Sequence, residues 1–222
     1  MIGPIPRGSL IVSCQARTDN PLHGPQFMGA MAIAARDGGA AAIRANGPDD
    51  VRACKRAGLP VIGLNKIFSD DFPVYITPSF ESARVLVEAG ADIIALDATP
   101  RSRDGEGIGE LISKITSMLA RPVFADCATL EEASAAEAAG AAYVSTTLSG
   151  YTDYSPRTLG PDLDLVRTLA THCKVPVIAE GRFNTPALAR AALDAGAHAV
   201  VVGTMITNPR EITRVFVAEV QR

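Results

Sequence analysis

Two side chains of this sequence could exchange a proton with a substrate carbon: Lys66 and Glu180. Glu180 follows the apolar run at 176–179, which predicts a short strand covered by protein on both faces. Lys66 follows a second apolar run, at 60–64. In water the pKa of lysine is about 10.4 and that of glutamate about 4.3, so each needs burial or a neighbouring charge to act near neutral pH. If the two face opposite sides of a carbon next to a carbonyl, one can remove a proton while the other returns it, which is epimerisation.

Lys66 has two other interpretations. A lysine in a protected pocket can form a Schiff base with a carbonyl substrate. It could also form an ordinary ion pair with Asp97, the residue that ends another predicted strand.

Polar residues or glycine end every predicted strand. In chain order these residues are Gln15, Arg44, Lys66, Asp97, Asp126, Thr147, Glu180 and Gly203. In a barrel of parallel strands such ends converge at one mouth, and that mouth is where enzymes of this architecture act.

The elements that must position these residues alternate regularly along the chain. Short apolar runs predict eight strands, at 10–14, 40–43, 60–64, 93–96, 122–125, 143–147, 176–179 and 199–202. Longer patterned segments predict helices at 27–36, 49–57, 80–89, 110–119, 130–140, 162–172, 186–195 and 211–220.

Helix ends carry recognisable signals. Thr129-Leu130-Glu131-Glu132 is a capping box, and Thr185-Pro186 predicts an N-cap followed by proline in the first helical turn. Four glycines stand just past a predicted helix and directly before a strand: Gly39, Gly90, Gly140 and Gly196.

Eight strand–helix units predict a single (β/α)8 TIM barrel spanning 1–222. An open doubly wound sheet is the alternative. The lack of a G-x-G-x-x-G turn after the first strand argues against a dinucleotide-binding fold of that kind.

Composition narrows the class of protein further. With 47% hydrophobic residues, 20% charged residues and a net charge of −3, the chain resembles soluble globular proteins. Scattered basic residues and 5% aromatics argue against nucleic-acid binding. The chain has neither a signal segment nor an apolar run long enough for a membrane helix, so a cytoplasmic location is expected. Its four cysteines are widely spaced and should be reduced, and no metal-ligand spacing is present.

Glycines after the seventh and eighth strands suggest a phosphate site. Gly181-Arg182 and Gly203-Thr204 occupy the usual barrel location of a phosphate held by backbone N–H groups, although tight turns also need glycine. Arg44 and Arg182 could bind a phosphate or carboxylate through paired donors, or could instead pair with Asp97 or Asp126.

Longer motifs resemble one known family. They include Ser13-Cys14-Gln15, Pro21-Leu22-His23-Gly24, Ile43-Arg44-Ala45-Asn46-Gly47, Val74-Tyr75-Ile76-Thr77-Pro78, Ala95-Leu96-Asp97-Ala98-Thr99, Thr146-Thr147-Leu148-Ser149-Gly150 and Ile178-Ala179-Glu180-Gly181-Arg182. Through nearly its whole length the chain is similar to the N-acetylmannosamine-6-phosphate 2-epimerases.

This resemblance implies a barrel of the ribulose-phosphate-binding type that interconverts N-acetylmannosamine 6-phosphate and N-acetylglucosamine 6-phosphate in sialic-acid breakdown, without metal or other cofactor. It also implies that the protein is a homodimer and that it binds a small molecule, an amino-sugar phosphate. By the same resemblance, Lys66 and Glu180 are the catalytic pair at C2 of the sugar. The substrate-binding residues would be Gln15, Arg44, Asp126 and Arg182, and the phosphate-binding residues Gly181, Gly203 and Thr204. A Schiff-base lyase, another phosphosugar isomerase or a non-catalytic phosphosugar-binding barrel are the alternatives.

The chain departs from the family pattern at two places. The family usually reads Ile-Ile-Lys-Arg-Asp around its lysine, where this chain reads Leu64-Asn65-Lys66-Ile67-Phe68. Near the C-terminus the family has an arginine in Ile-Thr-Arg-Pro, and here Asn208 takes that position. Because charge-assisted hydrogen bonds are stronger than neutral ones, this neutral residue should weaken or shift phosphate recognition.

Overall fold

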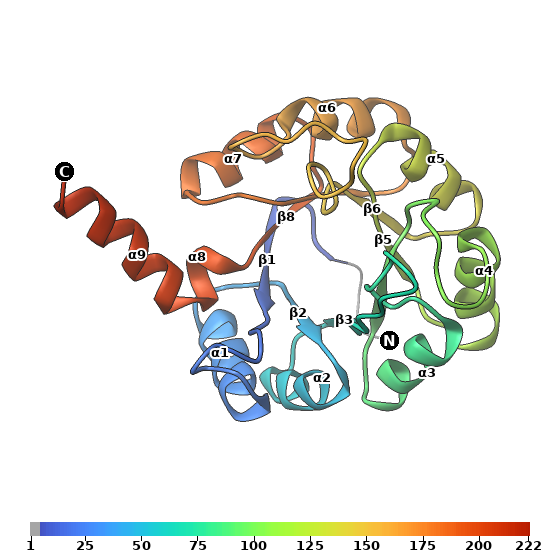
Figure 1. Cartoon of the computed structure of the whole chain (residues 1–222), viewed down its shortest axis with the longest axis horizontal. Coiled ribbons are helices and arrows are strands. Elements are labelled where there is room, and N and C mark those ends of the chain that lie inside the picture. Colours follow the sequence, from blue (N-terminus) through green and yellow to red (C-terminus); the bar gives the residue numbers. More distant parts are fainter. Residues whose placement is uncertain (1–4) are drawn as a thin grey trace.

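The computed structural model describes residues 5–222, which form a closed barrel of eight parallel strands (Figure 1). Each strand pairs with its neighbours in chain order, and β1 closes the barrel against β8. The strands are β1 (Ser9–Cys14), β2 (Ala42–Asn46), β3 (Val61–Leu64), β4 (Ile93–Asp97), β5 (Val123–Asp126), β6 (Tyr143–Ser145), β7 (Val177–Glu180) and β8 (Ala199–Val202). The predicted barrel is therefore confirmed, and the open-sheet alternative is wrong.

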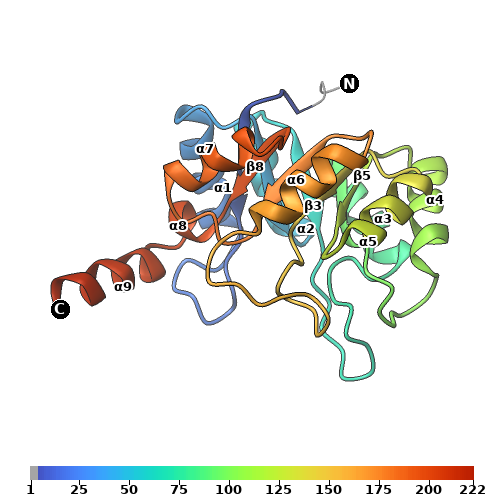
Figure 2. The same ribbon diagram turned by 90° about the horizontal axis from the view of Figure 1, so that it is seen from above.

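Helices surround the barrel and connect successive strands (Figures 1 and 2). They are α1 (Pro25–Asp37), α2 (Pro48–Cys54), which continues as a 3-10 turn (Lys55–Ala57), α3 (Phe80–Glu88), α4 (Ile108–Met118), α5 (Leu130–Ala138), α6 (Leu163–His172) and α7 (Pro186–Asp194). Two further helices follow β8: α8 (Thr204–Thr207) and α9 (Pro209–Val220). Figure 2 shows that the long loops after the strands extend on the side opposite the N-terminus.

Local signals in the sequence produce the predicted helix ends. The hydroxyl of Thr185 accepts a hydrogen bond from the N–H of Leu188 and caps α7, with Pro186 in its first turn. Thr129 caps α5 in the same way, although the carboxylate of Glu132 accepts from the N–H of Ala128 (2.6 Å) rather than from the cap residue itself. All four of the predicted joint glycines have positive φ, between 94° and 106°.

Two strand boundaries differ from the sequence prediction. β2 runs from Ala42 to Asn46, so Arg44 lies in the middle of the strand and not at its tip. The three alanines at 40–42 gave no signal for where the strand begins, because a run of identical small residues has no periodicity. β6 ends at Ser145, which leaves Thr147 in the following loop.

Side chains inside the barrel alternate with side chains packed under the helices. The inner layer includes Ile11, Ala42, Ile62, Phe124, Ile178 and Val201, all nearly inaccessible to solvent. The intervening residues of the same strands, such as Val12, Ile43 and Ala125, pack beneath the helices in a larger apolar cluster. Cys14, Cys54 and Cys127 are buried there, and their thiols are free.

The C-terminal end of the chain was only partly predicted. The short helix α8 after β8 was not expected from the sequence. The final helix, α9, exists as predicted but does not close the barrel. It has no buried residue, and Figure 1 shows it pointing away from the other helices.

Candidate active site

The inner register of the strands brings side chains from opposite sides of the barrel together at its mouth. Ala42, Phe124 and Ile178 point inward, and two residues further along the same strands come Arg44, Asp126 and Glu180. Because side chains of a strand alternate between faces, these three also point inward. Lys66 has the same relation to Leu64 of β3.

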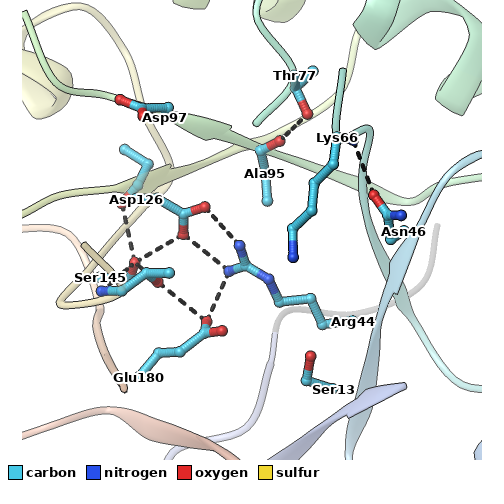
Figure 3. Close-up of polar contacts among 12 residues, drawn as sticks. Ser13, Arg44, Asn46, Lys66, Thr77, Ala95, Asp97, Asp126, Ser145 and Glu180 are labelled. Carbon is cyan, nitrogen blue, oxygen red and sulfur yellow. Dashed lines mark hydrogen bonds and ion pairs between the residues drawn. The ribbon is translucent and has the colours of Figure 1, made fainter. Parts of the chain in front are cut away.

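Arg44 is the centre of this cluster (Figure 3). Its two terminal nitrogens donate to the two carboxylate oxygens of Asp126, at 2.9 and 2.6 Å, and one of them also donates to Oε2 of Glu180 at 2.8 Å. The guanidinium stacks on the ring of Phe124, 5.0 Å from its centroid. Arg44 is only 1% exposed, so one buried cation joins two carboxylates that come from β5 and β7.

Burial shifts the pKa values of Arg44 and Glu180. Burial and the nearby Asp126 raise the pKa of Glu180, while Arg44 and a hydrogen bond from Thr147 (3.2 Å) oppose that rise. Burial alone would lower the pKa of Arg44, but the two carboxylates more than offset it and keep the guanidinium charged. Glu180 is therefore a better proton donor and acceptor near neutral pH than a glutamate in water.

Lys66 points toward the same cluster from the opposite wall (Figure 3). Burial and then the positive charge of Arg44 lower the pKa of Lys66, with Glu180 and Asp126 acting in the other direction. The alternative of an ion pair between Lys66 and Asp97 is not what the structure shows. Asp97 instead accepts from Arg101 (2.7 Å) and from the N–H and hydroxyl of Thr99. Lysine and glutamate are thus both shifted toward neutral pH, as proton transfer requires.

A folded loop holds the backbone of Lys66 in place. The N–H of Lys66 donates to the amide oxygen of Asn46 (2.9 Å), and Lys66 forms an antiparallel bridge with Ile76. At the base of this β3–α3 loop, the hydroxyl of Thr77 accepts from the N–H of Asn65 and donates to the carbonyl of Ala95 (2.6 Å). Asn46 and Thr77 were not singled out from the sequence. Asn46 lies at the end of β2, but the residue it contacts, Lys66, follows the neighbouring strand β3. Its role could therefore not be predicted from its own position in the sequence.

Gln15 lies at the mouth above β1, as predicted. Its side-chain nitrogen donates to the hydroxyl of Ser13 (2.8 Å), while its oxygen Oε1 is buried and has no hydrogen-bond partner among residues 5–222. Nε of Arg44 is also buried without a partner in that range. Buried polar atoms are usually paired, so these two can accept and donate hydrogen bonds to a bound ligand.

Arg182 is not brought to the cluster. Its three guanidinium nitrogens donate to the carbonyls of Gly160 and Ser149 and to the hydroxyl of Thr158, all in the β6–α6 loop. It also stacks on the ring of Tyr151, with 5.3 Å to the centroid. Each of its three nitrogens thus already donates to the loop, and contact between Arg182 and the substrate stays a prediction.

The three residues predicted for a phosphate lie after β7 and β8. Gly181 has φ 112°, a conformation that favours glycine. Gly203 is packed so closely on β1 that an added Cβ would lie 3.2 Å from the Cβ of Ser13. Thr204 begins α8, whose first N–H groups have no partner within the helix itself. These backbones lie where phosphosugar barrels bind phosphate.

Among residues 5–222, no three His, Cys, Asp or Glu side chains gather closely enough to hold a metal ion. No helix of the described chain is long and apolar enough to cross a membrane.

A closed (β/α)8 barrel with an inward lysine and an inward glutamate around one buried arginine defines a class: barrel enzymes that act by proton transfer. Sequence comparison gives the family. The family model described as "Putative N-acetylmannosamine-6-phosphate epimerase" matches residues 28–222, and the chain belongs to the N-acetylmannosamine-6-phosphate 2-epimerase family. The resemblance seen in the sequence is thus confirmed, and with it the assignment to the isomerases.

Individual relatives agree over almost the whole chain. A protein of Caldanaerobacter subterraneus subsp. tengcongensis, described as "Putative N-acetylmannosamine-6-phosphate 2-epimerase", is 51% identical, with 94% of this chain and 89% of that protein covered. A protein of Clostridium perfringens (strain SM101 / Type A) with the same description is 49% identical over 95% of this chain and 96% of its own length.

Solved structures agree with this assignment. The N-acetylmannosamine-6-phosphate 2-epimerase from Clostridium perfringens superposes with a TM-score of 0.93 at 46% identity, covering 97% of this chain and 94% of the other. Thiamine phosphate pyrophosphorylase from Pyrococcus furiosus is 19% identical with a TM-score of 0.62 over 93% of this chain and 90% of its own, and shows the fold alone.

Proposed function

We propose that this protein interconverts N-acetylmannosamine 6-phosphate and N-acetylglucosamine 6-phosphate by proton removal and return at C2. The observation that carries the proposal is the meeting of Lys66 and Glu180 around Arg44 in one buried mouth, with both pKa values shifted toward neutral. The names of the relatives supply the substrate. In the open-chain sugar, the aldehyde at C1 makes the C2 hydrogen acidic enough for a buried amine or carboxylate to remove it.

The other site residues receive roles that follow from their contacts. Arg44 and Gln15 each have a buried polar atom free for the sugar, so we assign them to substrate binding. Asp126 is fully buried and both its oxygens accept from Arg44, so it acts by orienting that guanidinium. Gly181, Gly203 and Thr204 offer backbone N–H groups to the phosphate. Arg182 acts through the β6–α6 loop, which it holds in place.

Deuterium incorporation tests the proposal directly. In deuterated water the enzyme should place deuterium at C2 of the product when it is given N-acetylmannosamine 6-phosphate, and NMR would show the C2 signal disappear. A conversion that gives neither deuterium at C2 nor a primary isotope effect with C2-deuterated substrate would mean that the C2–H bond is not broken, and the proposal would be wrong.

A Schiff-base reaction is the second candidate, because a buried lysine with a lowered pKa is also a good nucleophile. Borohydride treatment in the presence of substrate separates the two. Covalent labelling of Lys66 would favour the lyase, whereas full activity after treatment would favour epimerisation.

We also propose that the protein is a homodimer formed by exchange of α9. This helix has no buried residue, yet Val215, Phe216 and Val220 are exposed apolar side chains on it. The barrel has a groove with a cavity volume of about 240 Å³ where a last helix would pack, and its apolar lining includes Leu10 and Met31. An exposed apolar helix beside an unfilled apolar groove fits a second copy whose α9 fills it.

The wider setting follows from the substrate. A phosphorylated amino sugar is a metabolite of the cell interior, so we expect the enzyme in the cytoplasm. There it would serve the breakdown of sialic acid, and we expect its partners to be this sugar phosphate and a second copy of the chain, with no nucleic acid.

A further inference from the structure

The arginines around the mouth differ in whether their guanidinium groups already form hydrogen bonds or ion pairs with other residues. Several have donors that are engaged by other residues: Arg44, Arg101, Arg103, Arg182 and Arg210. Arg17, in the loop between β1 and α1, is different. Its backbone carbonyl accepts from the N–H of Asn20 (2.9 Å), but its guanidinium makes neither a hydrogen bond nor an ion pair with any residue between 5 and 222.

The loop that carries Arg17 is fixed against the start of α9. Asn20 is only 7% exposed, and its side-chain nitrogen donates to the side-chain oxygen of Asn208 at 3.2 Å. Arg210, two residues further on, pairs with Asp19 of the same loop at 3.1 Å. Two contacts therefore hold Arg17 beside the segment that follows Gly203 and Thr204, where the phosphate is expected.

Arg17 lies close to the reacting groups, in the loop that follows β1. The strand ends at Cys14, and Arg17 is an exposed residue three positions further on, just beyond Gln15, whose side chain donates to the hydroxyl of Ser13 (2.8 Å). Burial and the charge of Arg44 have larger effects, but the charge of Arg17 also lowers the pKa of Lys66. Its guanidinium therefore lies within electrostatic range of the reacting lysine.

Asn208 cannot supply a cation at this place. Its side-chain oxygen accepts from Asn20 and from the N–H of Glu211 (3.4 Å), so the neutral amide is used to cap α9 and to hold the β1–α1 loop. A substrate phosphate bound after β8 would thus meet backbone donors but no positive charge from residue 208.

We propose that Arg17 binds the phosphate of the substrate from the β1–α1 loop and so provides the charge that Asn208 does not. The inference rests on the proposed function, since it assigns a further residue to the same phosphosugar site. A guanidinium with free paired donors matches the geometry of a phosphate, and its charge strengthens each hydrogen bond. It makes Arg17 a specificity residue for phosphorylated over unphosphorylated amino sugars.

The test compares Arg17→Leu and Arg17→Lys with a matched control, Arg157→Leu, which removes another exposed arginine from the β6–α6 loop. Steady-state kinetics are measured with N-acetylmannosamine 6-phosphate and with unphosphorylated N-acetylmannosamine, together with inhibition by inorganic phosphate. We expect Arg17→Leu to raise KM for the phosphorylated sugar about 10- to 100-fold, the size of a lost charge-assisted hydrogen bond, with kcat little changed. Inhibition by inorganic phosphate should weaken in parallel, and Arg17→Lys should keep part of the affinity.

The phosphate dependence of the effect separates recognition from a structural role. Turnover of unphosphorylated sugar should not change in Arg17→Leu, and the control should behave as wild type with both sugars. An unchanged KM in Arg17→Leu, or an equal loss with both sugars, would overturn the inference.

The inference can fail separately from the proposed function. If wild-type enzyme turns over no amino-sugar phosphate, the proposed function is wrong, and calorimetric titration with inorganic phosphate still tests Arg17. Weaker phosphate binding by Arg17→Leu than by wild type would then support the role of Arg17, and equal binding would contradict it.

Discussion

At the scale of single residues, the chemistry depends on two side chains that burial makes unlike their counterparts in water. Desolvation disfavours the charged form of any group, so it lowers the pKa of Lys66 and raises that of Glu180. Arg44 connects the two, because it repels the charge of Lys66 and attracts the charge of Glu180. One buried cation thus influences both partners of the proposed proton transfer.

The roles of the catalytic pair lead to a first prediction. Lys66→Ala and Glu180→Gln should each lower turnover by at least about 10²-fold, the loss typical of a general acid or base. Initial rates of epimerisation, followed by NMR with protein of verified fold, provide the measurement. Wild-type rates in either variant would show that the residue does not transfer the proton.

Removal of the lysine should also stabilise the fold, which gives a second prediction. Because the folded pKa of Lys66 lies below its ordinary value of 10.5, holding its charge costs folding free energy at low and neutral pH. That cost is fully present below the folded pKa and disappears as the pH rises past 10.5. Lys66→Met should therefore raise Tm at pH 6 to 7, and the gain should shrink toward pH 10.

The control for this stability prediction is Lys174→Met, at an exposed lysine. It should leave Tm nearly constant over the same range of pH. If Lys66→Met lowered Tm at neutral pH, or if both variants responded alike, burial of the Lys66 charge would not be the cause.

At the scale of elements, the β3–α3 loop decides where Lys66 points. Lys66 lies just beyond β3, and the loop returns to form the bridge between Lys66 and Ile76. Thr77, with φ 46°, joins the loop to β4 through its hydroxyl hydrogen bond to Ala95. The position of Lys66 therefore depends on both ends of the β3–α3 loop being fixed, and not on β3 alone.

This anchoring leads to a third prediction. Thr77→Val keeps the shape of the side chain but leaves the N–H of Asn65 and the carbonyl of Ala95 without partners, which should cost about 1–3 kcal/mol of stability. We expect kcat to fall more than KM rises, since Lys66 moves while the sugar-binding groups remain. Chemical denaturation and steady-state kinetics measure the two effects.

Thr116→Val in α4 is a matched control for Thr77→Val. Its hydroxyl bonds back to the carbonyl of Ile112 within the helix, far from the mouth. This variant should change both stability and kcat little. Equal kinetic losses in the two variants would mean that the Thr77 anchor has no special influence on the lysine.

At the scale of the whole molecule, the barrel lacks its last covering helix. Helices α1 to α7 pack on the strands, while α9 extends from the rim with Phe216 67% exposed (Figures 1 and 2). The connection through α8 is short, and Asn208 separates the two helices. The apolar face of an amphipathic helix in this position can be buried only against a surface outside its own barrel.

The fourth prediction concerns this exchange. Phe216→Asp places a charge on the apolar face of α9, so it should shift the protein from dimer to monomer, as measured by light scattering after size-exclusion chromatography. Arg190→Asp, which changes the charge of an exposed residue of α7, should leave the dimer intact. A monomeric wild-type protein at micromolar concentration would contradict the exchange of α9.

The sequence by itself determined the barrel and the contents of its mouth. Short apolar runs that end in polar residues, with glycine after each helix, are local patterns, and the repeated unit needs only hydrogen bonds between neighbouring strands. Alternation along a strand also places Asp126 and Glu180 on the inner face, two residues after inward apolar residues. The position of Arg44 was predicted only in part, because β2 extends two residues beyond it, and the direction of Lys66 depends on the β3–α3 loop.

Tertiary structure alone decided which partners those residues have. Whether Arg44 binds Asp97 or Asp126 depends on the register across β2 to β7, and Arg182 is drawn to the β6–α6 loop by carbonyls more than twenty residues away. The direction of α9 likewise depends on a surface outside the helix. Local periodicity specifies the face on which a side chain lies, but its partners come from segments distant in the chain, and only the folded barrel brings those segments together.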